Sequence, residues 1–504
     1  MRSISFIVVL LLLAWNARAQ SCYGTDSKVE LAVAPENLLR KNVPKTLFGF
    51  DLPWYDAQVA YMRDGEFRKE FIAWMMPFKG AIYRYPAGTN TFEWRKAVGP
   101  QSKRREVFDL YVPDGSVMPQ LGPEEFLKLM ELVGGQPLWM LRMLDAQAGS
   151  ARKESKSDFV AENVDYAKWI LGKGPEICKT NSYCRINTYE LGNELDWGDL
   201  KWSASKYATA ASTLLRRMKE VDPRGKMVVM GKTSPWDSPE KATDALGDSF
   251  DQAVAKSLGA QSDGVSIHPY YDGLPINELE PFINRLSQVY RRHNADHKVY
   301  VTEHGRWPSI PKIGRWEDNW HQASGSQGAL SAVDFTMSMM RNKNVDVAVW
   351  HALGAKGPWQ LIKWDERRDE LYPSPTYWGL RLLRESYFDH LVQVQPAELR
   401  GGDYGGGYSI KTVAMLEEGA RRMSVVSVNR SSSGYWVKYK ISSDKFQDEA
   451  QTVRYFEADE KGTDHVDGDK NRFRVKRFSG APVKRAGHVC VPPHSIISLQ
   501  YTAR

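Results

Sequence analysis

Between residues 46 and 388, eight short apolar segments alternate with segments of helical periodicity, and this alternation limits the possible folds more than any other feature. The apolar segments have the length and texture of strands that are buried on both faces. They are Thr46–Phe50, Ala81–Tyr85, Leu138–Leu144, Thr188–Leu191, Met227–Met230, Gly264–Ile267, Val299–Thr302 and Asp346–Trp350. The segments between them have an apolar and a charged face at helical spacing. They include Glu125–Val133, Asp158–Leu171, Ser203–Val221, Asp244–Leu258, Pro281–His293 and Ala329–Arg341, and Tyr377–Phe388 reads as the closing helix.

Eight buried strands separated by helices predict an α/β fold, a parallel (β/α)8 TIM barrel, over residues 45–390. A doubly wound open sheet is the alternative for the same alternation. Such a sheet commonly carries a glycine-rich nucleotide-binding turn after its first strand, and none follows Thr46–Phe50. The barrel is therefore the favoured fold.

The pattern changes after the barrel. Residues 391–504 contain short alternating runs separated by Gly, Ser and Asp turns, which is typical of an antiparallel β-sandwich domain. The runs are Tyr408–Val413, Arg422–Val428, Trp436–Ile441, Thr452–Phe456 and Ile496–Tyr501. Residues 20–44 contain one further alternating segment, Val29–Val33, and we expect this N-terminal strand to join the C-terminal β-domain.

A length of 504 residues suits a large domain together with a smaller one. A content of 42% hydrophobic and 12% aromatic residues is typical of a globular protein. The formal net charge of +7 is small for this length, and no run of Lys and Arg indicates a nucleic-acid partner.

Residues 1–19 predict a secretory signal peptide, with Arg2 before an apolar stretch and Ala17-Arg18-Ala19 before the cleavage site. That stretch is short for a membrane span and no later one is long enough, so we expect a secreted or periplasmic protein; an uncleaved anchor is the alternative. The sequence carries no signal for an oligomeric state.

The four cysteines fit an oxidising compartment and allow three pairings. Cys178 and Cys184 lie close together in a polar loop, and we expect them to form a local disulfide. Cys22 and Cys490 would then join the two ends of the chain. No CxxC or Cys/His spacing indicates zinc, so we expect neither a metal nor a cofactor.

The first candidate catalytic residue lies in the segment Thr188–Gly198. This segment reads as a short strand that ends at Gly192 and places Asn193 and Glu194 in the following loop. A carboxyl group between an amide and the aromatic Trp197 suits an acid that cleaves sugars, because the ring excludes water and helps to keep the carboxyl protonated. The amide can bind a substrate hydroxyl. A glutamate that caps the next helix or pairs with a lysine is the alternative.

A second carboxylate, Glu303, follows the seventh predicted strand. In such barrels the carboxyl ends of the strands carry the chemistry, so Glu194, after the fourth strand, and Glu303 are expected on one face. A retaining glycosidase needs two carboxyl groups about 5–5.5 Å apart, one protonated and one ionised. We therefore interpret Glu194 as the acid/base and Glu303 as the nucleophile. A structural salt bridge to an arginine is the alternative for Glu303.

Further candidates end other strands. Arg84, on the second strand, is expected to hydrogen-bond Glu303 and keep it ionised, while Tyr270, after the sixth, would donate to the nucleophile. His268 would orient the substrate or the acid, and Trp350, which closes the eighth strand, would stack on a sugar ring. Each has a structural alternative: an arginine that binds backbone groups, a structural histidine, or a tryptophan that fills the core.

Tryptophans are enriched in the loops that follow the predicted strands. Aromatic faces stack on the apolar faces of sugars, so this enrichment favours a carbohydrate substrate over a small polar metabolite. The loop tryptophans are Trp197, Trp202, Trp236, Trp307, Trp316, Trp320 and Trp359, and we select Trp197 and Trp307 as substrate-binding candidates.

Several motifs resemble clan A of the glycoside hydrolases, and within it the α-L-arabinofuranosidases. Tyr83–Gly88, followed by Phe92-Glu93-Trp94 and Val98-Gly99-Pro100, is similar to that family's Arg-Tyr-Pro-Gly-Gly stretch and its later Trp and Gly-Pro. Leu191–Glu194, Ile267–Tyr270 and Pro375-Thr376-Tyr377 are similar as well. The resemblance implies a barrel with a β-domain built from both chain ends, and hydrolysis with retention by two glutamates.

The motifs depart from this family at Ala87, Thr89 and His304, where it has Gly, a substrate-binding Asn and Trp. Relatives in the clan that act on xylosides, glucuronides or marine galactans use the same pair of carboxylates. Arg306, Lys312 and Arg315 follow the nucleophile and would suit an acidic or sulfated substrate, or form a solvated basic loop. A non-catalytic carbohydrate-binding protein and a metal-dependent lyase or esterase are the alternatives from other classes. The last would need a His/Asp cluster or a serine elbow, and the sequence has neither.

Overall fold

The computed structural model describes residues 22, 27–108, 115–144, 159–197, 200–233, 249–271, 276–400, 408–447, 450–457, 476–480, 484–485 and 487–504. The predicted signal peptide and Trp236 lie outside these residues. None of the described helices is long and apolar enough to cross a bilayer.

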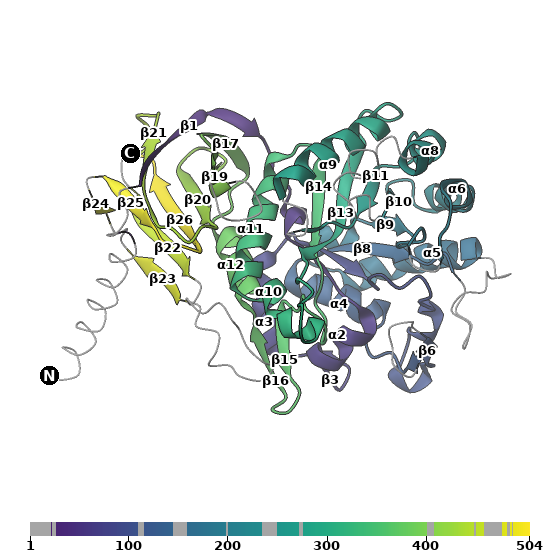
Figure 1. Ribbon diagram of the computed structural model, residues 1–504. Coiled ribbons are helices and arrows are strands. Elements are labelled where there is room, and N and C mark those ends of the chain that lie inside the picture. Colours follow the sequence, from purple (N-terminus) through teal and green to yellow (C-terminus); the bar gives the residue numbers. More distant parts are fainter. Residues whose placement is uncertain are drawn as a thin grey trace.

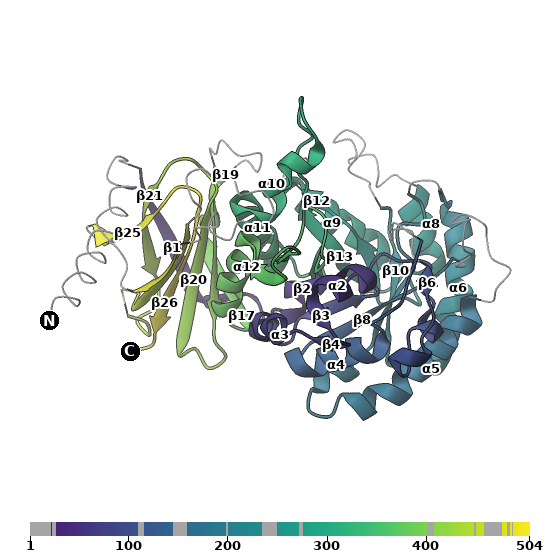
Figure 2. The same ribbon diagram turned by 90° about the horizontal axis from the view of Figure 1, so that it is seen from below.

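Eight parallel strands form a closed barrel that makes up one part of the molecule (Figures 1 and 2). In chain order they are β2 (Gly49–Asp51), β5 (Ile82–Tyr85), β8 (Gln136–Leu141), β9 (Thr188–Leu191), β10 (Lys226–Met230), β11 (Gly264–Ile267), β13 (Lys298–Arg306) and β14 (Val345–Trp350). Neighbours in this order pair with one another, and the pairing of β14 with β2 closes the ring. The predicted (β/α)8 barrel is confirmed.

Helices surround the barrel (Figure 1). They are α3 (Lys69–Met75), α4 (Pro123–Val133), α5 (Phe159–Ile177), α6 (Ala204–Val221), α8 (Ser249–Leu258), α9 (Ile276–Arg291), α11 (Ser326–Arg341) and α12 (Pro375–Glu385), with α2 (Trp54–Tyr61) between β2 and α3. The ends of α4 show why the chain is helical there: Pro123 opens the first turn, and the Glu125 carboxylate accepts the Gly122 backbone N–H at 3.0 Å. Gly134, at a φ of +68°, ends the helix in the left-handed conformation.

The barrel interior has an apolar layer with a polar layer above it. The apolar layer consists of Ile82, Leu138, Val228, Tyr300, Val347 and Val349. Alternate residues of a strand face the same side, so Arg84 and Thr302, two positions after Ile82 and Tyr300, lie one layer closer to the carboxyl ends. Both are fully buried. The strands thus carry polar side chains into the barrel at the end where the chemistry is expected.

Three predicted strands differ from the structure. The third, predicted as Leu138–Leu144, is Gln136–Leu141. Lys45–Phe48 forms a 3-10 helix, so only Gly49–Asp51 belongs to the first strand. The seventh strand continues to Arg306 because β12 (Tyr270–Tyr271) pairs with its end. Glu303 therefore lies within a strand and not after one.

The second part of the molecule is a mixed sheet that packs around its own apolar core. Its strands are β1 (Lys28–Arg40), β17 (His390–Gln395), β18 (Glu398–Arg400), β19 (Tyr408–Leu416), β20 (Arg422–Asn429), β21 (Tyr435–Ile441), β22 (Thr452–Glu457), β23 (Lys476–Gly480), β24 (Lys484–Arg485), β25 (His488–Val491) and β26 (Ser495–Thr502). The N-terminal strand β1 joins this sheet, as expected. It runs parallel to β21 and antiparallel to β17, so the predicted antiparallel domain contains one parallel pair.

Both predicted disulfides, Cys22–Cys490 and Cys178–Cys184, are present. The first fastens the N-terminal segment to the β-domain, where the Trp436 indole N–H also donates to the Cys22 carbonyl at 2.8 Å. The two ends of the chain therefore belong to one domain.

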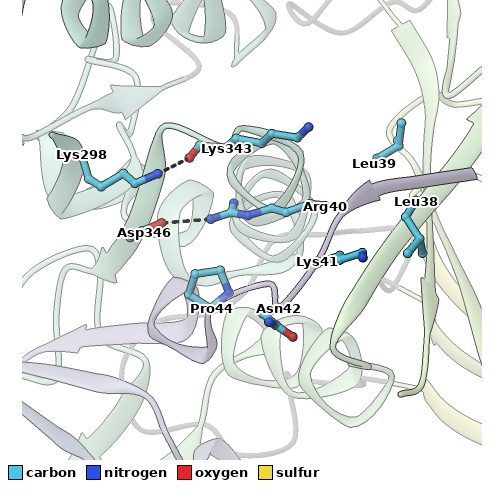
Figure 3. A pocket seen from close by; sticks show the side chains of 9 residues that line it. All are labelled: Leu38, Leu39, Arg40, Lys41, Asn42, Pro44, Lys298, Lys343 and Asp346. Atoms are coloured by element: carbon cyan, nitrogen blue, oxygen red, sulfur yellow. Dashed lines mark hydrogen bonds and ion pairs between the residues drawn. The ribbon is translucent and has the colours of Figure 1, made fainter. Parts of the chain in front are cut away.

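The end of β1 connects the β-domain to the amino-terminal face of the barrel. Arg40 donates to four backbone carbonyls at the end of α11 and the start of β14, and it pairs with Asp346 at 3.1 Å (Figure 3). A pocket of about 430 Å³ lies beside this junction. Because Lys298 and Asp346 stand at the starts of β13 and β14, this pocket is at the opposite end of the barrel from Glu194 and Glu303.

Candidate active site

Glu194 lies in a tight turn after β9. Gly192 (φ +80°) and Glu194 (φ +48°) both have left-handed backbone conformations. The backbone angle at Gly192 favours glycine, and a Cβ there would also lie 2.9 Å from the ends of the Leu195 and Met143 side chains, which would have to move. The Asn90 side chain, from the loop after β5, holds the turn by accepting from the Asn193 backbone N–H at 2.9 Å and donating to the Asn193 carbonyl.

The structure brings Glu194 and Glu303 together. One carboxylate oxygen from each and one ring nitrogen of His268 lie within 4.8 Å of one another. The Glu194 side chain is 26% exposed and that of Glu303 is 7% exposed, so Glu194 stands nearer to solvent than Glu303. This spacing suits a retaining glycosidase better than an inverting one, whose carboxyl groups stand about 6.5–9.5 Å apart.

Glu303 accepts one strong hydrogen bond on each oxygen. Arg84 Nη1 donates to Oε1 at 2.7 Å, and the Tyr270 hydroxyl donates to Oε2 at 2.7 Å. His351 Nδ1 lies 3.6 Å from the same Oε2. Burial would raise the pKa of Glu303, but the positive charges of His268, His351 and Arg84 and the Tyr270 hydrogen bond oppose it and lower the pKa far below its usual value. These interactions favour the ionised form of Glu303.

Arg84 is the buried centre of a network beneath the carboxylates. Its Nε donates to Glu190 at 2.5 Å and its Nη2 to the Asn193 side-chain oxygen at 2.5 Å, while Nη1 lies 3.4 Å from Asp51. Three carboxylates, including Glu303, therefore compensate one buried guanidinium. The same network fixes the Asn193 amide: because Arg84 takes its oxygen, its NH2 group remains as a donor.

Gly88 leaves open space beside this donor. A Cβ at Gly88 would lie 3.0 Å from Asn193 Nδ2 and 3.5 Å from Glu303 Oε1. Only a residue without a side chain leaves this volume free next to both groups. A substrate hydroxyl placed there would face the amide donor and the carboxylate.

His268 links Glu194 to a buried hydrogen-bond chain. Its Nδ1 lies 2.7 Å from Glu194 Oε1, and its Nε2 lies 3.0 Å from the Thr302 hydroxyl. Thr302 donates its one proton to Glu190 at 2.7 Å, so it must accept from His268 Nε2–H. The remaining proton lies between His268 Nδ1 and Glu194. Burial lowers the pKa of His268, but Glu303, Glu190 and Glu194 outweigh it and raise the pKa to about 10.

Sequence reasoning missed Asp51, Glu190 and His351. Asp51 and Glu190 are fully buried, and His351 Nδ1 lies 2.8 Å from Asp51 Oδ2 beside Glu303. The sequence could have identified Glu190, because it is a charged residue within an apolar strand. Its position in the two-residue period of that strand faces the barrel interior. His351 directly follows the last strand, where any residue reaches the catalytic face.

The tryptophan candidates separate in the structure. Trp350 was expected to stack on a sugar ring, but it is only 1% exposed and its ring has no open face for a sugar. It packs edge-on against His304, and its indole N–H donates to the Trp359 carbonyl. Trp307 is 41% exposed and contacts the Tyr270 ring. Trp197 is 47% exposed and its backbone N–H donates to the Glu194 carbonyl.

Two sets of described residues have the geometry to hold a metal ion: Asp51, Glu303 and His351, and Glu194, His268 and Glu303. Both sets share Glu303, which already accepts from Arg84 and Tyr270. A cation there would face the Arg84 guanidinium, 2.7 Å from that carboxylate. The expected independence from metals remains a prediction.

No protein-family model matches the chain. An exo-alpha-(1->6)-L-arabinofuranosidase from Bifidobacterium longum is 28% identical over 245 residues, which are 47% of this chain and 43% of that protein. A probable alpha-L-arabinofuranosidase C from Aspergillus fumigatus is 26% identical over 310 residues, 59% of this chain and 58% of that protein. The match thus spans about half the length of these curated relatives.

Solved structures share the fold over nearly the whole chain. The crystal structure of an alpha-L-arabinofuranosidase from Thermotoga maritima, in complex with arabinose, has a TM-score of 0.74 at 16% identity and covers 94% of this chain and 100% of that one. The chain is therefore similar to the α-L-arabinofuranosidase type of clan A, as its motifs indicated. These relatives are glycoside hydrolases, in agreement with the predicted enzyme class.

Proposed function

We propose that this protein is a secreted, retaining glycoside hydrolase that removes α-L-arabinofuranosyl units from plant or algal polysaccharides. The observation that carries the proposal is the approach of Glu194 and Glu303 to within 4.8 Å at the carboxyl end of a barrel. The likeness to arabinofuranosidases supports the sugar. The two disulfides support an oxidising compartment, and hence secretion.

The reaction takes two displacements. Glu303 attacks the anomeric carbon while Glu194 gives its proton to the departing glycosidic oxygen, which leaves a glycosyl ester on Glu303. Glu194, now ionised, takes a proton from water, and the resulting hydroxide oxygen attacks the same carbon and releases Glu303. Arg84 and Tyr270 hold Glu303 ionised and oriented for both steps.

The remaining side chains bind and orient. Asn193 presents its NH2 group beside Glu303, where it would donate to the hydroxyl next to the reacting carbon. His268 keeps the acid's proton between itself and Glu194. The site thus supplies one ionised carboxylate and one protonated pair, the division of roles that the mechanism needs.

Two variants test the roles of the glutamates. Replacing the nucleophile in Glu303→Ala should lower kcat by roughly 10⁴-fold or more with an unchanged circular dichroism spectrum. Glu194→Ala should slow a substrate with a poor leaving group by roughly 10²–10⁴-fold, but an aryl glycoside with an acidic phenol much less, because that phenol needs no proton. Equal losses on both substrates would rule out the acid role, and near-normal hydrolysis by Glu303→Ala would rule out the nucleophile.

The sugar needs its own experiment. Hydrolysis products from arabinan, xylan, agar, porphyran and an aryl glucuronide should show release from arabinan above the others. Release from xylan, a galactan or the glucuronide in its place would retain the mechanism and replace the substrate. No hydrolysis of any of them by the native protein would favour a carbohydrate-binding protein.

A further inference from the structure

A row of aromatic rings in mutual contact leads away from the nucleophile, and we call it the aromatic strip: Tyr270, Trp359, Trp307, Trp316 and Trp320. The Tyr270 hydroxyl donates to Glu303, and its ring lies 4.9 Å from Trp359 and 5.5 Å from Trp307 between centroids. Trp307 lies 5.4 Å from Trp359 and 5.5 Å from Trp316, and Trp316 lies 5.8 Å from Trp320. The strip therefore begins at the reacting group and continues without a gap.

Two loops at the carboxyl-terminal face of the barrel build the strip. Trp307, Trp316 and Trp320 come from the connection between β13 and α10 (His321–Ser324), which projects beside α10 in Figure 2, and Trp359 comes from the loop after β14. Backbone carbonyls hold two of the indole N–H groups: Arg306 accepts from Trp359 at 2.7 Å and Pro308 from Trp316 at 3.2 Å. The rings are thus oriented before any ligand arrives.

The exposure of the strip does not fit a role in packing alone. A packing cluster buries its central ring most deeply. Here Trp307, which touches three of the other four rings, is 41% exposed and is the most exposed of the five. A tryptophan that is 41% exposed and held by neighbouring rings suits contact with the apolar face of a sugar ring.

We propose that the aromatic strip binds sugar units beyond the one that is hydrolysed, so that the ligand is an oligosaccharide or polysaccharide chain and not a single terminal sugar on a small group. This rests on the proposed glycosidase function, because it takes Glu303 as the reacting end of the strip. Stacking on Trp307 and Trp316 would add binding energy for each further unit in contact.

The test compares chain lengths. The ratio of kcat/KM on a five-unit oligosaccharide to kcat/KM on the aryl glycoside of the same sugar should exceed one for the native protein. It should fall roughly tenfold in Trp316→Ala and be retained in Trp316→Phe, which keeps a ring. The matched control is Ile313→Ala in the same loop, because Ile313 is 94% exposed and the ratio should not change. A ratio that does not rise with length, or that Trp316→Ala leaves unaltered, overturns the proposal.

Binding without turnover separates this proposal from the proposed function. Isothermal titration of the Glu303→Gln variant with arabinopentaose, xylopentaose and a porphyran-derived oligosaccharide measures the strip without hydrolysis. At least one should bind more tightly than its two-unit counterpart, and adding Trp316→Ala should remove that gain, even if the native protein hydrolyses none of them. Equal affinity for both lengths of every oligosaccharide would contradict the binding role of the aromatic strip, as would a gain in affinity with length that persists in Trp316→Ala. Neither result would contradict the catalytic proposal.

Discussion

The proton that Glu194 would donate belongs to a pair. His268 Nδ1 and Glu194 Oε1 share one proton at 2.7 Å, and the Thr302–Glu190 chain fixes the other side of the imidazole. Because the pKa of His268 is raised to about 10, the pair retains its proton well above neutral pH. Once that proton has gone to the leaving group, none remains between His268 Nδ1 and Glu194, and Glu194 is free to take a proton from water in the second displacement.

Removing the imidazole should therefore narrow the pH range of activity from its basic side. His268→Asn removes the group whose pKa is raised to about 10, so the basic limb of kcat/KM should move to lower pH. The rate at neutral pH should fall roughly 10- to 100-fold. The measurement is the pH profile of kcat/KM for both proteins, and an unmoved basic limb would show that His268 has only a structural role.

The open volume beside Gly88 can be tested by filling it with a methyl group. A methyl group there would lie 3.0 Å from Asn193 Nδ2 and 3.5 Å from Glu303 Oε1, in the volume assigned to a substrate hydroxyl. Gly88→Ala should raise KM roughly tenfold or more, with a melting temperature close to that of the native protein. Gly172→Ala is the control, because a Cβ there would meet nothing within 4 Å and Gly172 lies in helix α5, so KM should not change. An unchanged KM in Gly88→Ala would show that the substrate does not occupy this volume.

The strands show which parts of the site sequence could predict. Glu194 and Glu303 follow from counting strands, because parallel strands of a barrel all end on one face. The length of β13 did not follow, since it depends on pairing with β12, a contact between distant segments. The period of two along β9 could have identified Glu190, whereas the burial of Trp350 depends on packing against His304, which no local pattern reports.

Helix α11 joins the barrel to the β-domain through a buried ion cluster. Asp334, on α11, pairs with Lys411 of β19 at 2.8 Å and with Arg430, which follows β20, at 2.7 Å. All three side chains are fully buried, and although Lys411 also lies 3.5 Å from Glu398 of β18, Asp334 is the carboxylate that both cations of the β-domain share.

Removing that carboxylate should destabilise the protein strongly. Asp334→Ala leaves Lys411 and Arg430 buried without their shared counter-ion, and we expect a loss of roughly 3–5 kcal/mol in the free energy of unfolding. Glu220→Ala is the control, since the Arg216–Glu220 pair is exposed and should contribute about 0.5 kcal/mol or less. Urea denaturation of the two variants measures both values, and similar losses would contradict the assigned importance of the cluster.

In the molecule as a whole, the β-domain and the carboxylate site occupy different parts of the structure. The β-domain, built from both ends of the chain, packs beside α11 and α12 (Figure 1), and Arg40 ties it to the amino-terminal face of the barrel (Figure 3). The carboxylates and the aromatic strip lie at the carboxyl-terminal ends of the strands. The β-domain thus supports the barrel without contributing to the described carboxylate site.

The configuration of the first product tests the central claim most directly. Proton NMR of the native protein acting on an aryl α-L-arabinofuranoside distinguishes the anomers of the released sugar before they interconvert. Two glutamates within 4.8 Å predict that the α-anomer appears first, because two displacements restore the original configuration. Initial release of the β-anomer would mean a single displacement by water, and Glu303 would then not be a nucleophile.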